Sequence, residues 1–141
     1  MRRTRKALVL GTALALVSGA AGHSAELRMV FPDLPATGQV ALAIFASPAA
    51  WKRATGPAWS GTATPSQGAL RIVRDLPPGE YAIMAYHDRN ANGRLDTLPV
   101  GLPTEAYGFS NDARGMFGPP PWRSAAFRLD ALGTEQVIRL R

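Results

Sequence analysis

The sequence predicts an all-β domain, a single antiparallel β-sandwich of six or seven strands, behind a short export signal. Apolar and polar residues alternate with a period of two in five separate runs after Gly22. Proline, glycine and asparagine turn signals separate these runs. None of the runs has the longer apolar period of a helix. Alternation over about four to eight residues is typical of half-buried strands, and regularly spaced turns join such strands into a sandwich.

The first half of the domain holds two clear strands. Leu27, Met29 and Phe31 alternate with other residues in the first, and the second spans 40–45. Prolines and a glycine between residues 32 and 38 predict the turn that joins them. Weaker strands are expected near residues 60–64 and 69–73, and the only helical turn expected lies at 51–54.

The second half holds the other three runs. A strand over residues 81–86 follows the Pro77-Pro78-Gly79 turn, and the last two strands are expected at 127–130 and 137–141. A glycine-containing turn at 132–134 precedes the final strand.

Two connections, residues 46–68 and 97–123, are too long for hairpin loops. Long connections in compact domains are usually functional or disordered, and the aromatic residues of the second favour an ordered loop folded on the sandwich. Its aromatics are a candidate ligand platform, although core packing is their commoner role: Tyr107, Phe109, Phe117 and Trp122.

The N-terminus has the three parts of a secretory signal peptide. Basic residues crowd the first six positions, an apolar run extends from Ala7 to about Gly22, and small residues follow. We therefore expect residues 1–25 to be a signal peptide and 26–141 to form the domain. An uncleaved anchor is the alternative. Export would place the domain in the periplasm or outside the cell.

Charge and cysteine content argue against several classes of protein function. The chain carries 16 basic and 10 acidic residues, for a net charge of +6, and has no cysteine. Residues 1–25 contain four of the basic residues and no acidic one, which leaves 12 against 10, or +2. The remaining arginines are scattered, so nucleic-acid binding is not expected. Disulfides and thiolate chemistry are absent, and no second apolar stretch predicts a membrane span.

The segment 88–96 resembles a calcium loop. Asp88, Asn90, Asn92 and Asp96 occupy relative positions one, three, five and nine, and the carbonyl of Arg94 could serve at position seven. Glu105 is a possible supporting carboxylate. Position twelve is a proline where a calcium loop needs a bidentate glutamate, so binding would be weak. The alternative is a hairpin whose side chains cap their own backbone.

Support for catalysis is thin. His87 is the only histidine after residue 25, which rules out a zinc cluster. Ser110 and Asp88 could complete a triad with it by composition, but no nucleophile motif supports this.

Several runs resemble a known bacterial family. They span Tyr86–Asp96, Gly101–Asn111, Gly118–Pro120 and Ala125–Phe127. These runs resemble the secreted family called domain of unknown function 2141, and the likeness extends over Leu27 to Leu140. The resemblance implies export and a β-sandwich, with no established activity, cofactor or catalytic residue. The turn at 76–81 is also similar to transthyretin-like and carboxypeptidase-regulatory-like sandwiches, so the fold is expected to be transthyretin-like or immunoglobulin-like.

The function predicted is an exported, non-catalytic module that binds an unknown envelope protein or a glycan through its long loops. No cofactor is certain, and calcium is a candidate for one loop. The alternative is a small secreted hydrolase or isomerase with a site around His87, Asp96 and Glu105.

Export gives the first testable prediction. Protein recovered from the periplasm or medium should begin between Gly22 and Glu26 on N-terminal sequencing, because a signal peptidase cleaves after small residues. Recovery of intact Met1 there, or of folded protein only in the cytoplasm, would contradict it.

Overall fold

The computed structural model describes residues 22–141, so the expected signal peptide, except for Gly22–Ala25, lies outside the described residues. Within 22–141 no helix is long and apolar enough to cross a membrane.

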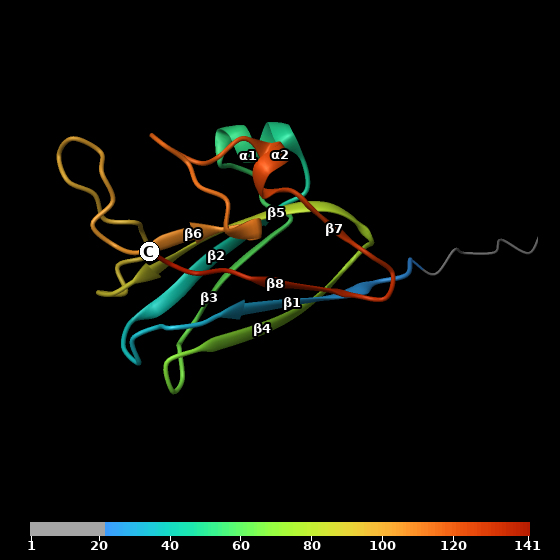
Figure 1. Cartoon of the computed structure of the whole chain (residues 1–141), viewed down its shortest axis with the longest axis horizontal. Coiled ribbons are helices and arrows are strands. Elements are labelled where there is room, and N and C mark those ends of the chain that lie inside the picture. The colour runs from blue at the N-terminus through green and yellow to red at the C-terminus, as the bar shows by residue number, and fades with distance from the viewer. Residues whose placement is uncertain (1–21) are drawn as a thin grey trace, which may run out of the picture.

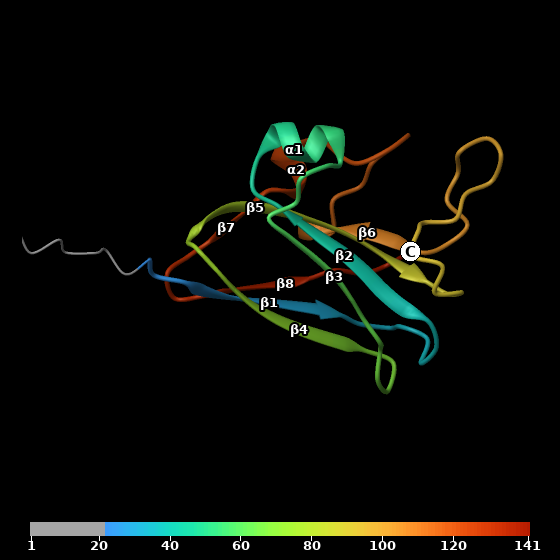
Figure 2. The ribbon, with the colours of Figure 1, turned by 180° about the vertical axis from the view of Figure 1, so that it is seen from behind.

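Two β-sheets pack face to face (Figures 1 and 2). The smaller sheet has the order β4 (Leu70–Leu76), β1 (Ala25–Phe31), β8 (Thr134–Val137). The larger has the order β3 (Trp59–Ala63), β2 (Gln39–Phe45), β5 (Gly79–Asp88), β6 (Tyr107–Phe109), and β7 (Phe127–Leu129) pairs with the start of β5. The all-β sandwich prediction is confirmed.

The last strand, β8, ends at Val137, which is the first residue of the strand expected at 137–141. The structure refines the prediction in two further places. It has eight strands among the described residues, because the segment expected as a loop over 97–123 contains the three-residue β6. All pairings are antiparallel except that of β1 with β8, which is parallel. Ser110 fills the gap in pairing along β5 between β6 and β7, since its hydroxyl accepts a hydrogen bond from the Ile83 amide at 2.9 Å.

The main core lies between the two sheets and follows the alternation of the strands. In β1 every second side chain is buried, from Ala25 to Phe31. The fully buried large side chains of this core are Leu27, Met29, Phe31, Val40, Ile44, Ile83, Leu129 and Ile138.

A second cluster covers one end of the outer face of the larger sheet. There α1 (Pro48–Arg53) and α2 (Trp122–Ala125) lie side by side over the sheet (Figures 1 and 2). Trp51 is buried between them, with edge-on contacts to Phe45 and Phe109 at ring-centroid distances of 5.7 and 5.9 Å. Its indole N–H donates to the Pro120 carbonyl at 2.8 Å, so the partner that a buried indole needs is present.

The C-terminal segment runs beside β6. The amide of Tyr107 donates to the carbonyl oxygen of Arg141, and the Arg141 amide donates back to Tyr107, both at 3.0 Å. This close approach depends on Gly108, because a Cβ atom there would lie 2.5 Å from the Arg139 carbonyl oxygen.

Gly108→Ala should therefore displace the C-terminal segment and cost about 1–3 kcal/mol of unfolding free energy, as overpacking against backbone does. Denaturant unfolding monitored by circular dichroism measures the loss. Gly79→Ala is the matched control, since its Cβ would meet only ordinary contacts at 3.7 Å or beyond. Equal stability of the two variants would contradict the account.

Candidate functional site

A buried carboxylate organises the loop that follows β5. Asp88 has no exposed surface and accepts hydrogen bonds from the amides of Asn92 at 3.1 Å and Gly93 at 2.8 Å. The side-chain amide of Gln39, on β2, donates to it at 3.2 Å. Gly93 has a φ of 80°, which a glycine adopts without strain and which closes the turn around the carboxylate.

These donors determine the ionisation of Asp88. Burial by itself raises its pKa, but hydrogen bonds from the Gly93 amide, the Gln39 side chain and the Asn92 and Ala91 amides outweigh burial and hold the pKa below its ordinary value. Asp88 is therefore a structural anion at neutral pH.

Glu105 binds the two ends of the same loop. It is buried, and its two carboxylate oxygens accept the Arg89 amide at 2.9 Å and the Asp96 amide at 3.0 Å. Asp96 in turn accepts the side-chain amides of Asn90 at 2.8 Å and Asn92 at 2.7 Å. We call these residues, Asp88, Asn90, Asn92, Asp96 and Glu105, the polar cluster.

The polar cluster satisfies its own charges. Every carboxylate oxygen in it accepts at least one N–H, and the donors are chiefly backbone amides and asparagine side chains. To bind calcium, Asn90 and Asn92 would have to turn their side-chain oxygens, in place of the side-chain nitrogens that now donate to Asp96, toward the ion. Arg94 is exposed, and its amide donates to Asn92 at 3.1 Å. Residues 22–141 contain no group of three or more histidine, aspartate or glutamate residues placed to hold a metal. Calcium binding stays a prediction.

The four candidate aromatics do not form one platform. Tyr107 and Phe109 lie on the same face of β6, with ring centroids 5.8 Å apart. Trp122 instead contacts Trp51 under α1, and its indole donates to Glu80 at 2.6 Å. Phe117 is 98% exposed at the tip of the connection between β6 and α2.

The uncovered end of the outer face forms an open groove of about 830 Å³, which we call the outer groove. Two cross-strand rows of side chains make its floor: Thr62, Ala41, Tyr86 and Tyr107 in one, and Ser60, Ala43, Met84 and Phe109 in the other. Its walls are residues 95–103 and the tip at 116–119, two loops that project from the same side of the sheet (Figure 2).

Sequence reasoning named Tyr107 and Phe109 as candidate ligand contacts but missed the part of the floor that β3, β2 and β5 supply. The available signal was in β2, where small Ala41 and Ala43 alternate with large Val40, Leu42 and Ile44. A strand that is large on one face and small on the other packs a core on the first and leaves space over the second.

Of the candidate catalytic residues within 22–141, the structure joins Asp96 and Glu105, through the hydrogen bond from the Asp96 amide to the Glu105 carboxylate at 3.0 Å, but neither His87 nor Ser110 joins them. A ring nitrogen of His87 lies 2.7 Å from the Thr37 carbonyl oxygen, on the side of β5 opposite Asp88. The hydroxyl of Ser110 donates to the Ala125 carbonyl and accepts from Ile83. Among the described residues no hydrogen bond joins His87 to Ser110, Asp96 or Glu105.

The ionisation of Asp88 predicts a pH dependence. A depressed folded-state pKa contributes stability that is fully present above the unfolded pKa of about 3.9 and is lost as pH falls through the folded value. Asp88→Asn should lower the melting temperature by several degrees at neutral pH, and this difference should shrink below roughly pH 4. Thermal melts across pH measure it. Asp75→Asn, at an exposed position of β4, is the control, and a pH-independent gap would contradict the prediction.

Calcium binding is tested separately. If the loop binds calcium, the ion should stabilise the chain by about 2.7 kcal/mol at roughly a hundredfold excess over its dissociation constant. Asp96→Asn should abolish that rise in melting temperature, whereas Asp130→Asn, at an exposed residue outside the loop, should keep it. A melting temperature that calcium leaves unchanged would refute the metal hypothesis.

Comparison with known proteins places the chain in a family. A family model described as an uncharacterized protein conserved in bacteria, DUF2141, matches residues 34–137. The matched segment includes the polar cluster, the floor of the outer groove and both of its walls. Searches of curated proteins and of solved structures gave no significant match. Because the family model covers well over half of the chain, this protein belongs to the DUF2141 family.

Proposed function

We propose that this chain is an exported, non-catalytic binding module of the bacterial envelope or extracellular space, and that its ligand binds in the outer groove. The observation that carries the proposal is the groove itself, an open end of a sheet face whose other end is fully covered by α1 and α2. Its volume of about 830 Å³ falls in the range of small-molecule sites.

The walls of the groove support a binding role. Val100, Met116 and Phe117 are 78%, 86% and 98% exposed, and all three line the groove. Large apolar side chains gathered at one exposed site indicate an interaction surface.

The polar cluster supports one wall. Glu105 holds the Asp96 amide, and the Asp96 carbonyl accepts the amide and the hydroxyl of Thr104. The hairpin beyond is closed by a hydrogen bond from the Leu98 amide to the Leu102 carbonyl at 2.8 Å. The motif that resembles a calcium loop therefore fixes the base of the hairpin that lines the groove.

The lining of the groove favours an apolar ligand over a glycan. It also favours binding over catalysis. Tyrosines are its only titratable side chains, and its hydrogen-bonding side chains are few: Ser60, Thr62, Thr97, Tyr86 and Tyr107. Acid–base catalysis needs a group that titrates near the working pH. A hydrolase or isomerase site around His87, Asp96 and Glu105 has no support from this lining.

Filling the groove should abolish binding. Ala43→Trp places a large side chain on the floor, whereas Val73→Trp, the matched control, places one on the exposed face of β4. Protein purified gently from the envelope and examined by native mass spectrometry should carry a bound apolar species in the unmodified chain and the control.

Ala43→Trp should lack that species while keeping the β-sheet circular dichroism spectrum. Retention of the same species by Ala43→Trp would place the ligand elsewhere and overturn the proposed site. Steady conversion of the species by the unmodified chain would favour the enzyme alternative.

A further inference from the structure

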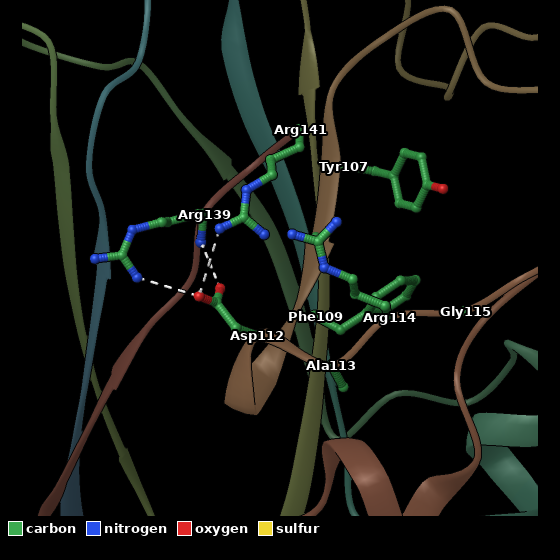
Figure 3. Close-up of a pocket in the computed structure, with 9 residues that line it drawn as sticks. Tyr107, Phe109, Asp112, Ala113, Arg114, Gly115, Arg139 and Arg141 are labelled. Atoms are coloured by element: carbon green, nitrogen blue, oxygen red, sulfur yellow. Dashed lines mark hydrogen bonds and ion pairs between the residues drawn. The ribbon is translucent and has the colours of Figure 1, made fainter.

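A smaller pocket lies beside the outer groove, between residues 112–115 and the C-terminal segment (Figure 3). Its volume is about 110 Å³, which is enough to admit a small polar group. Three arginines line it: Arg114, Arg139 and Arg141. We call it the arginine pocket.

The arginine pocket has an excess of positive charge. Asp112 is its only acidic side chain, and it accepts the Arg139 amide at 3.2 Å and the Arg139 guanidinium at 3.1 Å, with Arg141 at 3.8 Å. The carbonyl oxygen of Arg141 already accepts the Tyr107 amide. Three guanidinium groups therefore exceed the negative charge nearby.

Arg114 is the guanidinium without a partner. It forms no ion pair with any of the residues 22–141. Figure 3 shows its guanidinium and that of Arg141 turned toward each other across the pocket. Like charges that face each other repel, and an anion between them would convert this repulsion into two attractive contacts.

The two cavities adjoin each other. Tyr107 and Phe109 line both, and Gly115 of the arginine pocket is followed in the chain by Met116 of the outer groove. The floor of the groove then extends from β6 across β5 and β2 to β3, a span of roughly 14 Å at about 4.8 Å per strand. A largely apolar groove therefore lies next to a cationic pocket.

We propose that the groove and the arginine pocket together bind one single-chain anionic amphiphile. Its head, a carboxylate or a phosphate, lies between the guanidiniums of Arg114 and Arg141, and its hydrocarbon tail lies along the floor toward β3. This inference rests on the proposed function for the groove and adds the chemical class of the ligand. Guanidinium forks match carboxylate and phosphate oxygens in geometry and charge.

Calorimetric titration of the mature chain with dodecyl phosphate, dodecanoate, dodecanol and inorganic phosphate tests the inference, with each amphiphile kept below micelle formation. The two anionic amphiphiles should saturate at one per chain and bind about tenfold more tightly than dodecanol. Inorganic phosphate alone should bind weakly. A preference between the two anions would identify the head group.

Variants distinguish binding of the ligand's head group from binding of its hydrocarbon tail. Arg114→Gln should reduce the affinity for the anionic amphiphiles to that for dodecanol, whereas Arg71→Gln, at an exposed position on β4, should not change it. Phe117→Ala should weaken the binding of all three amphiphiles. Leu132→Ala, at a residue that is equally exposed at 98% but lies in the turn before β8, should weaken the binding of none.

Three results would overturn the inference. Equal binding of dodecanol and the anionic amphiphiles, with no effect of Arg114→Gln, would remove the head-group site and leave the groove function standing. Failure of all three amphiphiles to bind would reject both proposals. Binding to vesicles that contain phosphatidylglycerol, but to neither phosphatidylcholine vesicles nor monomeric amphiphile, would show that a membrane surface is the partner instead.

Discussion

Two buried carboxylates, Asp88 and Glu105, hold together a part of this protein that has little apolar core of its own. Burying an anion is costly unless hydrogen-bond donors replace its water. Here backbone amides of the loop after β5 supply most of these donors. Straightening the loop would remove these donors and leave buried carboxylates unpaired, so the chain at Asp96 stays close to the end of β5.

The consequence lies on the outer face of the larger sheet. The hairpin at 97–103 begins where the Asp96 carbonyl accepts Thr104, and its position sets one wall of the outer groove. Tyr86 connects the two regions, since it lies on the groove floor and its pKa is raised by burial and by the charges of Asp88, Glu105 and Asp96. The opposite wall leads into α2 through Pro120, whose carbonyl accepts the Trp51 indole N–H.

Much of this arrangement could be predicted from the sequence. Alternation located the strands because one face of each is buried, as Leu27, Met29 and Phe31 show. The spacing of Asp88, Asn90, Asn92 and Asp96 predicted a loop with converging side chains, and Glu105 accepts the Asp96 amide of that loop. The same spacing suits a calcium-binding loop and a loop whose side chains cap its own backbone, because both require inward-pointing oxygens and a glycine turn. Sequence alone therefore left both possibilities open.

The groove could not be predicted in this way. It is made by residues from four strands and two loops, and their alignment depends on register, such as that of Ala43 with Ser60 and Met84. The aromatic residues were interpreted by type, which could not separate Trp122, fixed under α1, from Phe117, exposed at a tip. The parallel pairing of β1 with β8 places Arg139 and Arg141 beside β6, and nothing in the spacing of those arginines indicated their meeting with Arg114.

The central claim is that the open end of the outer face is the ligand-binding surface of this protein. Backbone amide NMR during titration with dodecanoate tests it most directly, because each residue reports separately. The account predicts saturable shifts concentrated at Ala41, Ala43, Met84 and Tyr107, in the walls at 95–103 and 116–119 and at Arg114, with β1 and β4 unchanged. Shifts concentrated on β1 and β4, or spread without saturation over the whole domain, would contradict it.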